Sequence, residues 1–157
     1  MISVLFVCLG NICRSPMAEA VFGDMVRVAG LEDRVTVDSA GTGNWHIGHH
    51  PHPGTLQILK RHGIPEGSRA RQITVADLEQ SDYVIVMDES NRKNVMALAS
   101  KARPCTARIH LLLEFAPEVG EREVPDPYFT GEFEGIFTMV TAGCAGLLRE
   151  IRKTKNL

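Results

Sequence analysis

Residues 2–16 read ISVLFVCLGNICRSP, an apolar run followed by a polar connection that ends in Ser-Pro. The apolar run, residues 2–7, is typical of a strand that is buried on both faces, as in a parallel sheet. Ser15 and Pro16 are residue types that start a helix, and we expect Ser15 at the N-cap and Pro16 at the first helical position. A helix over residues 17–29 is predicted to follow. This strand–turn–helix unit indicates an α/β fold.

The rest of the chain alternates predicted strands with predicted helices. Further strands are expected over residues 34–38, 82–87 and 108–113. Further helices are expected over residues 55–62, 75–80, 89–99 and 133–153. The alternation favours a single α/β domain, residues 1–157, with a mostly parallel four-stranded sheet and helices on both faces. In such sheets ligands bind beyond the carboxyl ends of the strands.

Composition argues against several classes of protein. The chain has 157 residues, with 17 Lys and Arg against 19 Asp and Glu, for a formal net charge of -2. A general nucleic-acid binder would carry a basic excess instead. The four cysteines are too few for a disulfide scaffold, and no apolar stretch is long enough to span a bilayer. Residues 1–8 lack the features of a secretory signal, so we expect a cytoplasmic protein with reduced thiols.

The connection between the first strand and the first helix has the features of an anion-binding loop. Cys8 and Arg14 stand at its two ends, with five residues between them. Gly10 and Asn11 tolerate the positive φ that a curled loop requires, so the loop amides can point inward and cradle an anion at the start of a helix. Arg14 adds a planar fork that can hold two phosphate oxygens. Cys8 would be a stabilised thiolate at the base of this cradle, with Ser15 donating a hydrogen bond to the sulfur.

An ordinary turn with a buried cysteine is the alternative, since each of these residues is common by itself. The combination of strand, Cys, Gly-Asn, Arg, Ser and Pro within one connection is much harder to obtain by chance. Other phosphate-binding loops fit less well. The chain has no G-x-x-x-x-G-K-[ST] motif, and residues 41–43 lack the third glycine of a dinucleotide-binding loop.

A cysteine nucleophile also needs a group that protonates the leaving oxygen. The candidate is Asp126, within the sequence VPDPYF at residues 124–129. The flanking prolines are expected to keep this segment out of regular structure. A carboxyl held above a phosphate dianion favours its protonated form, so it could act as a general acid and then as a general base for water. A solvated aspartate in a turn is the alternative, and Asp38 and Asp88 at strand ends are rival acids.

These motifs resemble those of the low-molecular-weight protein tyrosine phosphatases, and the resemblance covers essentially the whole chain. The specific matches are VCLGNICRSP (residues 7–16) and DPY (residues 126–128), in the expected order near opposite ends of the chain. Between them lie further matches: AEA (18–20), DSAGT (38–42), HGI (62–64), ARQI (70–73) and MDESN (87–91). The resemblance implies a twisted, mostly parallel four-stranded sheet flanked by helices.

The resemblance also implies a two-step hydrolysis of aryl phosphates. Cys8 would attack the phosphorus and form a phosphocysteine while Asp126 protonates the departing phenolate, and water activated by Asp126 would then release phosphate. Arg14 would bind the transferring phosphoryl group together with the loop, whose further members are Leu9, Gly10, Asn11, Ile12, Cys13 and Ser15. The substrate would be a tyrosine-phosphorylated protein, and no cofactor or metal is implied. Family members are often monomers, with weak self-association through the active-site face in some, so we expect a monomer.

The remaining cysteines and one serine are interpreted through the same resemblance. Cys13 matches a second loop cysteine that forms a reversible disulfide with the nucleophile under peroxide, although a small packing residue fits this position equally well. Cys105 and Cys144 have no partner at suggestive spacing and are expected to be structural. Some relatives carry a histidine in the hydrogen-bond network behind the loop, where this chain has Ser68.

Aromatic and histidine side chains are expected around the pocket. Trp45 and Tyr128 match the aromatic walls that grip the phosphotyrosine ring in the family. The loop over residues 39–53 carries four of the histidines: His46, His49, His50 and His52. No cysteine or carboxylate joins them at ligand spacing, so a solvated loop at the pocket rim is favoured over a metal site.

Three other functions are alternatives. Arsenate reductases of this fold pass oxidation through two further cysteines near the middle of the chain, whereas this sequence has no cysteine between Arg14 and Pro104. Protein-arginine phosphatases carry threonine where this chain has Ile12, and Ile12 together with Tyr128 favours an aromatic substrate. A non-catalytic phosphate-binding module would need neither the thiol nor the acid.

Overall fold

The apolar run near the N-terminus forms an inner strand, β1 (Ile2–Cys8), in the computed structural model, which describes residues 1–157. Its side chains alternate between two hydrophobic cores. Val4 and Phe6 belong to the larger core, and Leu5 and Val7 belong to the smaller one. All four side chains are buried, so the strand is covered on both faces, as predicted.

Four parallel strands form the sheet, in the order β2-β1-β3-β4. The other three strands are β2 (Val35–Gly41), β3 (Tyr83–Val86) and β4 (Arg108–Leu111). The predicted α/β class and four-stranded sheet are confirmed, and the sheet is parallel throughout. Cys8 pairs with Gly41 across β1 and β2, so these two strands end together at the edge where the loop begins.

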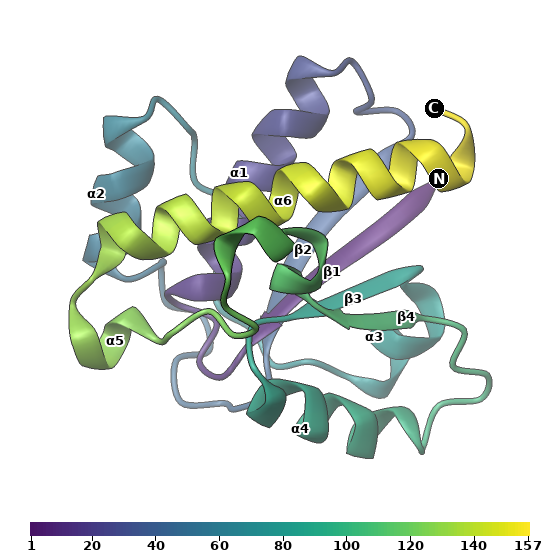
Figure 1. The fold of residues 1–157 in the computed structure, drawn as a ribbon. Helices are drawn as coiled ribbons and strands as arrows, with labels where there is room; N and C mark the ends of the chain where they lie inside the picture. The colour runs from purple at the N-terminus through teal and green to yellow at the C-terminus, as the bar shows by residue number, and fades with distance from the viewer.

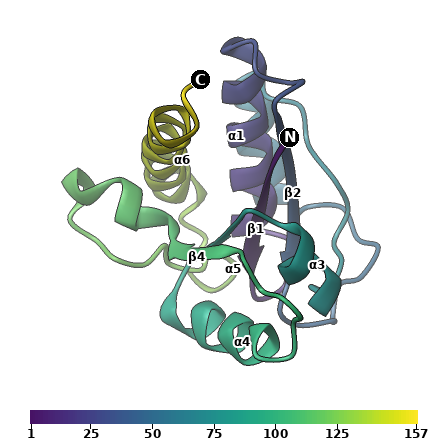
Figure 2. The same cartoon turned by 90° about the vertical axis from the view of Figure 1, so that its right-hand side faces the viewer.

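Helices cover both faces of this sheet (Figures 1 and 2). They are α1 (Arg14–Val28), α2 (Pro53–Arg61), α3 (Val75–Gln80), α4 (Glu89–Ala99), α5 (Pro127–Thr130) and α6 (Phe133–Lys155), with two 3-10 turns, η1 (Leu112–Phe115) and η2 (Pro117–Val119). The larger core lies between the sheet and α1, α2 and α6, and the smaller core lies between the sheet and α3 and α4. None of the helices combines the length and the apolar character that a bilayer crossing demands.

The predicted start of the first helix is wrong. Helix α1 begins at Arg14, its N-cap is Cys13, and that cap makes no side-chain hydrogen bond. Ser15 therefore lies inside the first turn, and Pro16 is not the first helical residue. The Ser15 side chain is fully buried, and its hydroxyl lies next to the Cys8 sulfur rather than capping the helix.

Several further boundaries differ from the sequence predictions: the strand predicted over residues 108–113 ends at Leu111, where η1 follows, and two other differences bear on the site. The prolines around Asp126 do not exclude regular structure, because the short helix α5 begins at Pro127 with Asp126 as its N-cap. Proline is favoured at the first helical position, where its missing N–H would have no partner. Strand β2 continues to Gly41, because it pairs with β1 as far as Cys8, so Asp38 lies within the strand and not at its end.

Candidate active site

The loop between β1 and α1 surrounds the sulfur of Cys8. Asn11 has a φ of 56°, in the left-handed region, and its backbone N–H donates a hydrogen bond to the Cys8 Sγ at 3.3 Å. The Ser15 Oγ lies 3.1 Å from the same sulfur and accepts a hydrogen bond from the Asn11 Nδ2 at 2.7 Å. Because Ser15 accepts from Asn11, its own hydrogen can point at the sulfur or at the Ala40 backbone oxygen, which lies 3.5 Å away. The predicted positive φ is thus found at Asn11, whereas Gly10 does not have one.

Other backbone donors of this loop have no acceptor within the chain. The N–H groups of Leu9, Gly10, Ile12 and Cys13 make no hydrogen bond. They belong to the connection that leads into the N-terminus of α1, where the helix contributes a positive partial charge. Unpaired donors at a helix N-terminus bind anions such as phosphate. The predicted anion cradle is therefore supported by the hydrogen-bond pattern.

Arg14 lies at the end of the loop and is buried, with 2% of its surface exposed. Its Nη1 donates to the Asp88 Oδ2 at 2.6 Å and to the Val124 backbone oxygen at 2.9 Å, and its Nη2 lies 3.5 Å from the Asp126 Oδ2. Its Nε is buried without a hydrogen-bond partner. Burial lowers the pKa of Arg14, but the negative charges of Cys8, Asp88 and Asp126 outweigh this effect, so the pKa is raised above its usual value.

The three candidate acids occupy different places. Asp126 lines a cavity above the loop, and its Oδ1 accepts a hydrogen bond from the Tyr128 backbone N–H at 3.0 Å. Asp88 caps α4 and forms the ion pair with Arg14. Asp38 pairs with Arg71 at 2.9 Å and does not line the cavity. Of the three, only Asp126 stands where it could protonate a leaving group.

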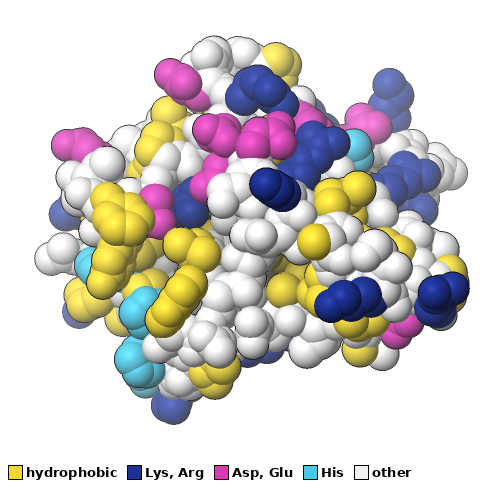
Figure 3. All heavy atoms as spheres, turned by 90° about the horizontal axis from the view of Figure 1, so that it is seen from below, with side chains coloured by type: hydrophobic (Ala, Val, Ile, Leu, Met, Phe, Trp, Pro, Cys, Tyr) yellow, Lys and Arg dark blue, Asp and Glu magenta, His cyan; other side chains and the backbone are white.

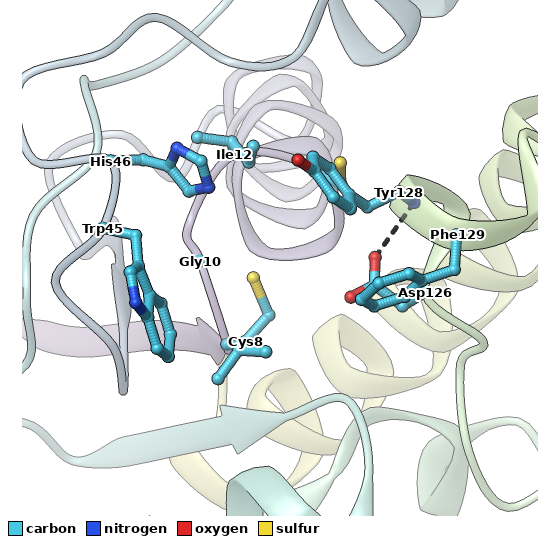
Figure 4. A pocket seen from close by; sticks show the side chains of 10 residues that line it. Cys8, Gly10, Ile12, Trp45, His46, Asp126, Tyr128 and Phe129 are labelled. Atoms are coloured by element: carbon cyan, nitrogen blue, oxygen red, sulfur yellow. Dashed lines mark hydrogen bonds between the residues drawn. The ribbon is translucent and has the colours of Figure 1, made fainter.

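A cavity of about 220 Å³ opens above the loop (Figure 4). In Figure 4 the Cys8 sulfur points into the space between Trp45 on one side and Tyr128 and Asp126 on the other. The cavity is lined by Cys8, Leu9, Gly10, Ile12, Cys13, Trp45, His46, Asp126, Tyr128 and Phe129. The structure thus brings the predicted nucleophile, acid and aromatic walls together.

Residues 3–157 match the family described as low molecular weight phosphotyrosine protein phosphatase. The chain belongs to this family. The low molecular weight protein-tyrosine-phosphatase YfkJ of Bacillus subtilis is 49% identical over 158 residues, covering 100% of both chains. The low molecular weight protein-tyrosine-phosphatase PtpA of Staphylococcus epidermidis is 43% identical, covering 100% of this chain and 98% of that protein.

Solved structures of relatives have the same fold. The crystal structure of YfkJ from Bacillus subtilis superposes with a TM-score of 0.93, at 49% identity, covering 99% of this chain and 97% of that chain. The crystal structure of DARP, the Drosophila arginine phosphatase, superposes with a TM-score of 0.89, at 35% identity, covering 95% of this chain and 97% of that chain.

Two residues that line the cavity were not predicted as parts of the phosphatase site. His46 was expected only as a rim histidine, and it lies against Gly10, where a Cβ would come within 3.1 Å of its Cδ2 atom. Phe129 is 76% exposed and lies beside Tyr128, with the ring centroids 5.3 Å apart. The position of Phe129 directly after Tyr128 is the sequence feature that could have indicated its place in the cavity wall.

The other histidines of this phosphatase have separate contacts. His52 caps α2, because its Nδ1 accepts a hydrogen bond from the Gly54 N–H at 3.0 Å, and its ring stacks on Phe133 with centroids 5.1 Å apart. His50 lies 3.6 Å from Glu66 at the surface. No group of three or more His, Cys, Asp or Glu side chains is arranged to hold a metal ion.

A buried polar network supports the phosphatase loop from behind. Asn11 donates to the Ser39 Oγ at 2.9 Å, and Ser39 donates to the Glu19 Oε1 at 2.5 Å. Ser68 also binds Glu19, through its N–H at 2.9 Å and its hydroxyl at 2.8 Å. Ser68 therefore belongs to the hydrogen-bond network behind the loop. The contributions of Glu19 and Ser39 were not predicted, because serine and glutamate patterns have no specific meaning in one sequence.

The four cysteines of the phosphatase are all free. Burial, together with the negative charges of Asp126 and Cys8, raises the pKa of Cys13 to about 12, despite the opposing effect of Arg14. Cys144 is fully buried in α6, and burial raises its pKa as well. Cys105 packs against the smaller core. Neither Cys105 nor Cys144 lines the cavity.

Proposed function

We propose that this protein is a protein tyrosine phosphatase that hydrolyses phosphotyrosine, and small aryl phosphates, through a phosphocysteine at Cys8. One observation carries the proposal. The Cys8 sulfur accepts a hydrogen bond from the Asn11 N–H and lies 3.1 Å from the Ser15 hydroxyl, in a loop with further unpaired amides, and Asp126 lines the same cavity. A thiolate held by donors and faced by an acid is suited to phosphoryl transfer.

In the first step the Cys8 thiolate attacks phosphorus and forms the S–P bond. The P–O bond to the aromatic ring breaks, and Asp126 transfers its proton to the leaving phenolate oxygen. The loop amides and the unpartnered Arg14 Nε bind the equatorial oxygens, which satisfies donors that otherwise lack partners. Asp88 and the Val124 carbonyl hold the guanidinium in place.

In the second step water attacks phosphorus from the side that the phenol has left. The Asp126 carboxylate takes a proton from this water, the S–P bond breaks, and its electron pair returns to the Cys8 sulfur. Inorganic phosphate then leaves. Both steps need only this chain's side chains and backbone donors, so the main contributions are positioning and charge stabilisation.

The walls of the cavity favour a flat aromatic group. Trp45, Tyr128 and Phe129 are all more than half exposed, and each lines the cavity. Ile12 adds an aliphatic wall. Figure 3 shows exposed hydrophobic side chains beside histidine side chains on this face of the molecule. An aromatic ring held between such surfaces gains apolar contact and edge or face interactions.

Phosphoarginine is the second candidate substrate. Its support is the similarity to DARP, whose structure is that of an arginine phosphatase. Ile12 argues against phosphoarginine, because it adds an aliphatic wall at the position where arginine phosphatases carry threonine. An Ile12→Thr variant should therefore raise the rate on phosphoarginine relative to phosphotyrosine. Arsenate reduction fits poorly, since neither Cys105 nor Cys144 lines the cavity to relay oxidation.

The central experiment measures hydrolysis of para-nitrophenyl phosphate by the wild type and by Cys8→Ser. We expect turnover by the wild type and none by Cys8→Ser. Peptides with phosphotyrosine, phosphoarginine or phosphoserine then rank the substrate classes. A wild-type protein that binds phosphate but hydrolyses none of these substrates would instead be a phosphate-binding module.

The free thiols of the loop indicate the cellular compartment in which we propose that this activity takes place. Free Cys8 and Cys13 in one small loop need a reducing compartment, and we infer a cytoplasmic protein that acts on tyrosine-phosphorylated proteins. We also infer a monomer, with weak self-association through the exposed aromatic face. Size-exclusion chromatography over a range of concentrations tests the oligomeric state.

A further inference from the structure

A second cavity adjoins the catalytic one. Its volume is about 300 Å³, and it lies between the loops that follow β1 and β2, the segment before α3, and helix α4. Leu9 and Trp45 line both cavities. The indole of Trp45 is therefore a wall between them, and Figure 4 shows it on the side of the catalytic cavity.

This wall is held in place from the side of the second cavity. Gly43 packs so closely against the six-membered ring of Trp45 that a Cβ at this position would overlap the ring. The Gly43 N–H donates to the Leu9 backbone oxygen at 2.9 Å, and the Gln72 Nε2 donates to the Thr42 backbone oxygen at 3.1 Å. The second cavity is thus tied directly to the phosphate loop by backbone hydrogen bonds.

The lining of the second cavity contains no charged side chain. Ile73 and Leu98 are apolar, and Gln72 and Asn94 contribute exposed amides. The hydroxyl oxygen of Thr42 is buried without a hydrogen-bond partner. A charged group entering here would lose water and find no counter-ion, whereas an uncharged side chain with an apolar stem and a polar end would satisfy both kinds of wall. Glutamine is such a side chain.

The spacing of the two cavities fits an extended peptide. Side chains two residues apart point to the same face of an extended chain and are separated by about 6.6 Å. Because Leu9 and Trp45 line both cavities, groups in the two cavities can be separated by one shared side chain, or about 7–8 Å. A phosphotyrosine in the catalytic cavity would therefore place the residue two positions away in the second cavity.

We propose that the second cavity is a substrate subsite that receives an uncharged side chain two residues from the phosphotyrosine. This inference rests on the proposed phosphotyrosine phosphatase function and deepens it. The phosphotyrosine ring then contacts Trp45 in the catalytic cavity, and the flanking side chain lies among the uncharged residues of the second cavity. The subsite selects among phosphoproteins by their sequence, which the phosphate loop alone cannot do.

The first test compares matched phosphopeptides that differ at one flanking position. Each peptide has alanine around the phosphotyrosine, with Gln, Asp or Lys placed one or two residues before or after it. Each kcat/KM is divided by the kcat/KM of the same protein for para-nitrophenyl phosphate, which has no flanking residue. We expect Gln to exceed Asp and Lys by about fivefold at a position two residues away, and no such preference at the adjacent positions.

The second test places a charge in the subsite. Asn94→Asp adds a carboxylate at an exposed position of α4, and we expect it to raise the preference for Lys over Gln by about fivefold. Asn156→Asp makes the same chemical change at the exposed end of α6, outside both cavities, and should leave the preference unchanged. Equal preferences in the two variants would overturn the subsite.

The same peptides are also bound to Cys8→Ser, with affinity measured by fluorescence anisotropy. If the affinity of Cys8→Ser depends on the residue two positions from the phosphotyrosine, but the wild type hydrolyses no phosphate ester, the subsite is supported and the proposed function is rejected. If the wild type hydrolyses the peptides rapidly, and neither the rates nor the affinities depend on that residue, the function is supported and the subsite is rejected.

Discussion

The Ser15 hydroxyl lies 3.1 Å from the Cys8 sulfur, fully buried beneath the phosphate loop. It accepts a hydrogen bond from Asn11, and Asn11 in turn donates to Ser39. The Ser15 hydrogen is then available to the sulfur, which lies nearer than its other acceptor, the Ala40 backbone oxygen at 3.5 Å. We expect this chain of donors to stabilise the negative charge that the sulfur carries when it becomes the leaving group in the second step.

Removing this hydroxyl tests its contribution. Ser15→Ala should lower kcat for para-nitrophenyl phosphate by about 10- to 100-fold, because a hydrogen bond to a charged group contributes about 1.5–3 kcal/mol. Steady-state kinetics measures the loss, and a thermal melt checks folding. Ser100→Ala removes an exposed hydroxyl at the end of α4 and should leave kcat unchanged. A Ser15→Ala protein with wild-type kcat would show that the sulfur does not depend on this donor.

The role of Asp126 as general acid can be tested by comparing esters whose leaving phenolates differ in their need for a proton. Asp126→Asn keeps an oxygen that can accept from the Tyr128 N–H, so α5 retains its cap while the acidic proton is lost. We expect kcat/KM for phenyl phosphate, which reports the first step, to fall by about 10²–10⁴-fold, and kcat/KM for dinitrophenyl phosphate to fall much less, because that phenolate needs no proton.

Glu121→Gln is the matched control for Asp126→Asn. Glu121 is exposed in the same segment and does not line the cavity, so its variant should keep the wild-type rate on both esters. An equal loss of kcat/KM on both esters in Asp126→Asn would contradict the role of acid in the first step. Asp88 would then be the next candidate, although its ion pair with Arg14 already assigns it a positioning role.

The elements that carry their own local signal were predicted well. The apolar run of β1 and the Gly-Asn turn after it are informative in sequence, because burial on both faces and a positive φ each demand particular residue types. The α/β architecture followed from the alternation of such segments. Helix boundaries were less predictable. Ser15 has the ideal type for an N-cap, yet tertiary contact with the Cys8 sulfur draws it into the first turn of α1.

The parts of the site that depend on contacts between distant segments were not predicted. Gly10 looked like a residue that supplies positive φ, but its role here is to leave room for His46 from the loop after β2. Gly43 likewise fits closely beneath Trp45. A single sequence records that a position is glycine, but it does not record which side chain occupies the space that a Cβ would fill.

The ion pair of Asp77 predicts a change of stability with pH. Burial raises the pKa of Asp77. Hydrogen bonds from Arg71 and Thr74 and the charge of Arg71 lower this pKa by a larger amount, so the net pKa lies below its usual value. A carboxyl whose pKa is depressed on folding stabilises the protein above its unfolded pKa of about 4, and this stabilisation is lost as pH falls through the folded pKa.

Asp77→Asn should therefore lower the free energy of unfolding at pH 7 and at pH 5, and the difference from the wild type should shrink as pH falls below about 4. Urea denaturation at each pH measures this difference. Asp33→Asn makes the same change at an exposed aspartate that forms no salt bridge, and should have little effect at any pH. A difference for Asp77→Asn that stays constant down to pH 3 would contradict the assignment.

Cys13 is expected to protect the nucleophile from irreversible oxidation. Peroxide oxidises the Cys8 thiolate to a sulfenic acid with release of water, and the Cys13 thiol then attacks that sulfur, releasing a second water and forming a disulfide. The pKa of Cys13, raised to about 12 by burial and nearby negative charge, keeps it protonated near neutral pH, so Cys13 itself reacts slowly with peroxide. Wild-type activity should then return after treatment with dithiothreitol.

In Cys13→Ser no resolving thiol is present in the loop, so continued exposure to peroxide should carry Cys8 to the sulfinic acid, which thiols do not reduce. Activity regained after dithiothreitol should fall at least severalfold below that of the wild type, and mass spectrometry should show two added oxygens on Cys8. Cys105→Ser removes a thiol outside the cavity and should recover like the wild type. Equal recovery by Cys13→Ser and the wild type would leave Cys13 with a packing role alone, because the sulfenic acid would then be reduced without a partner from the loop.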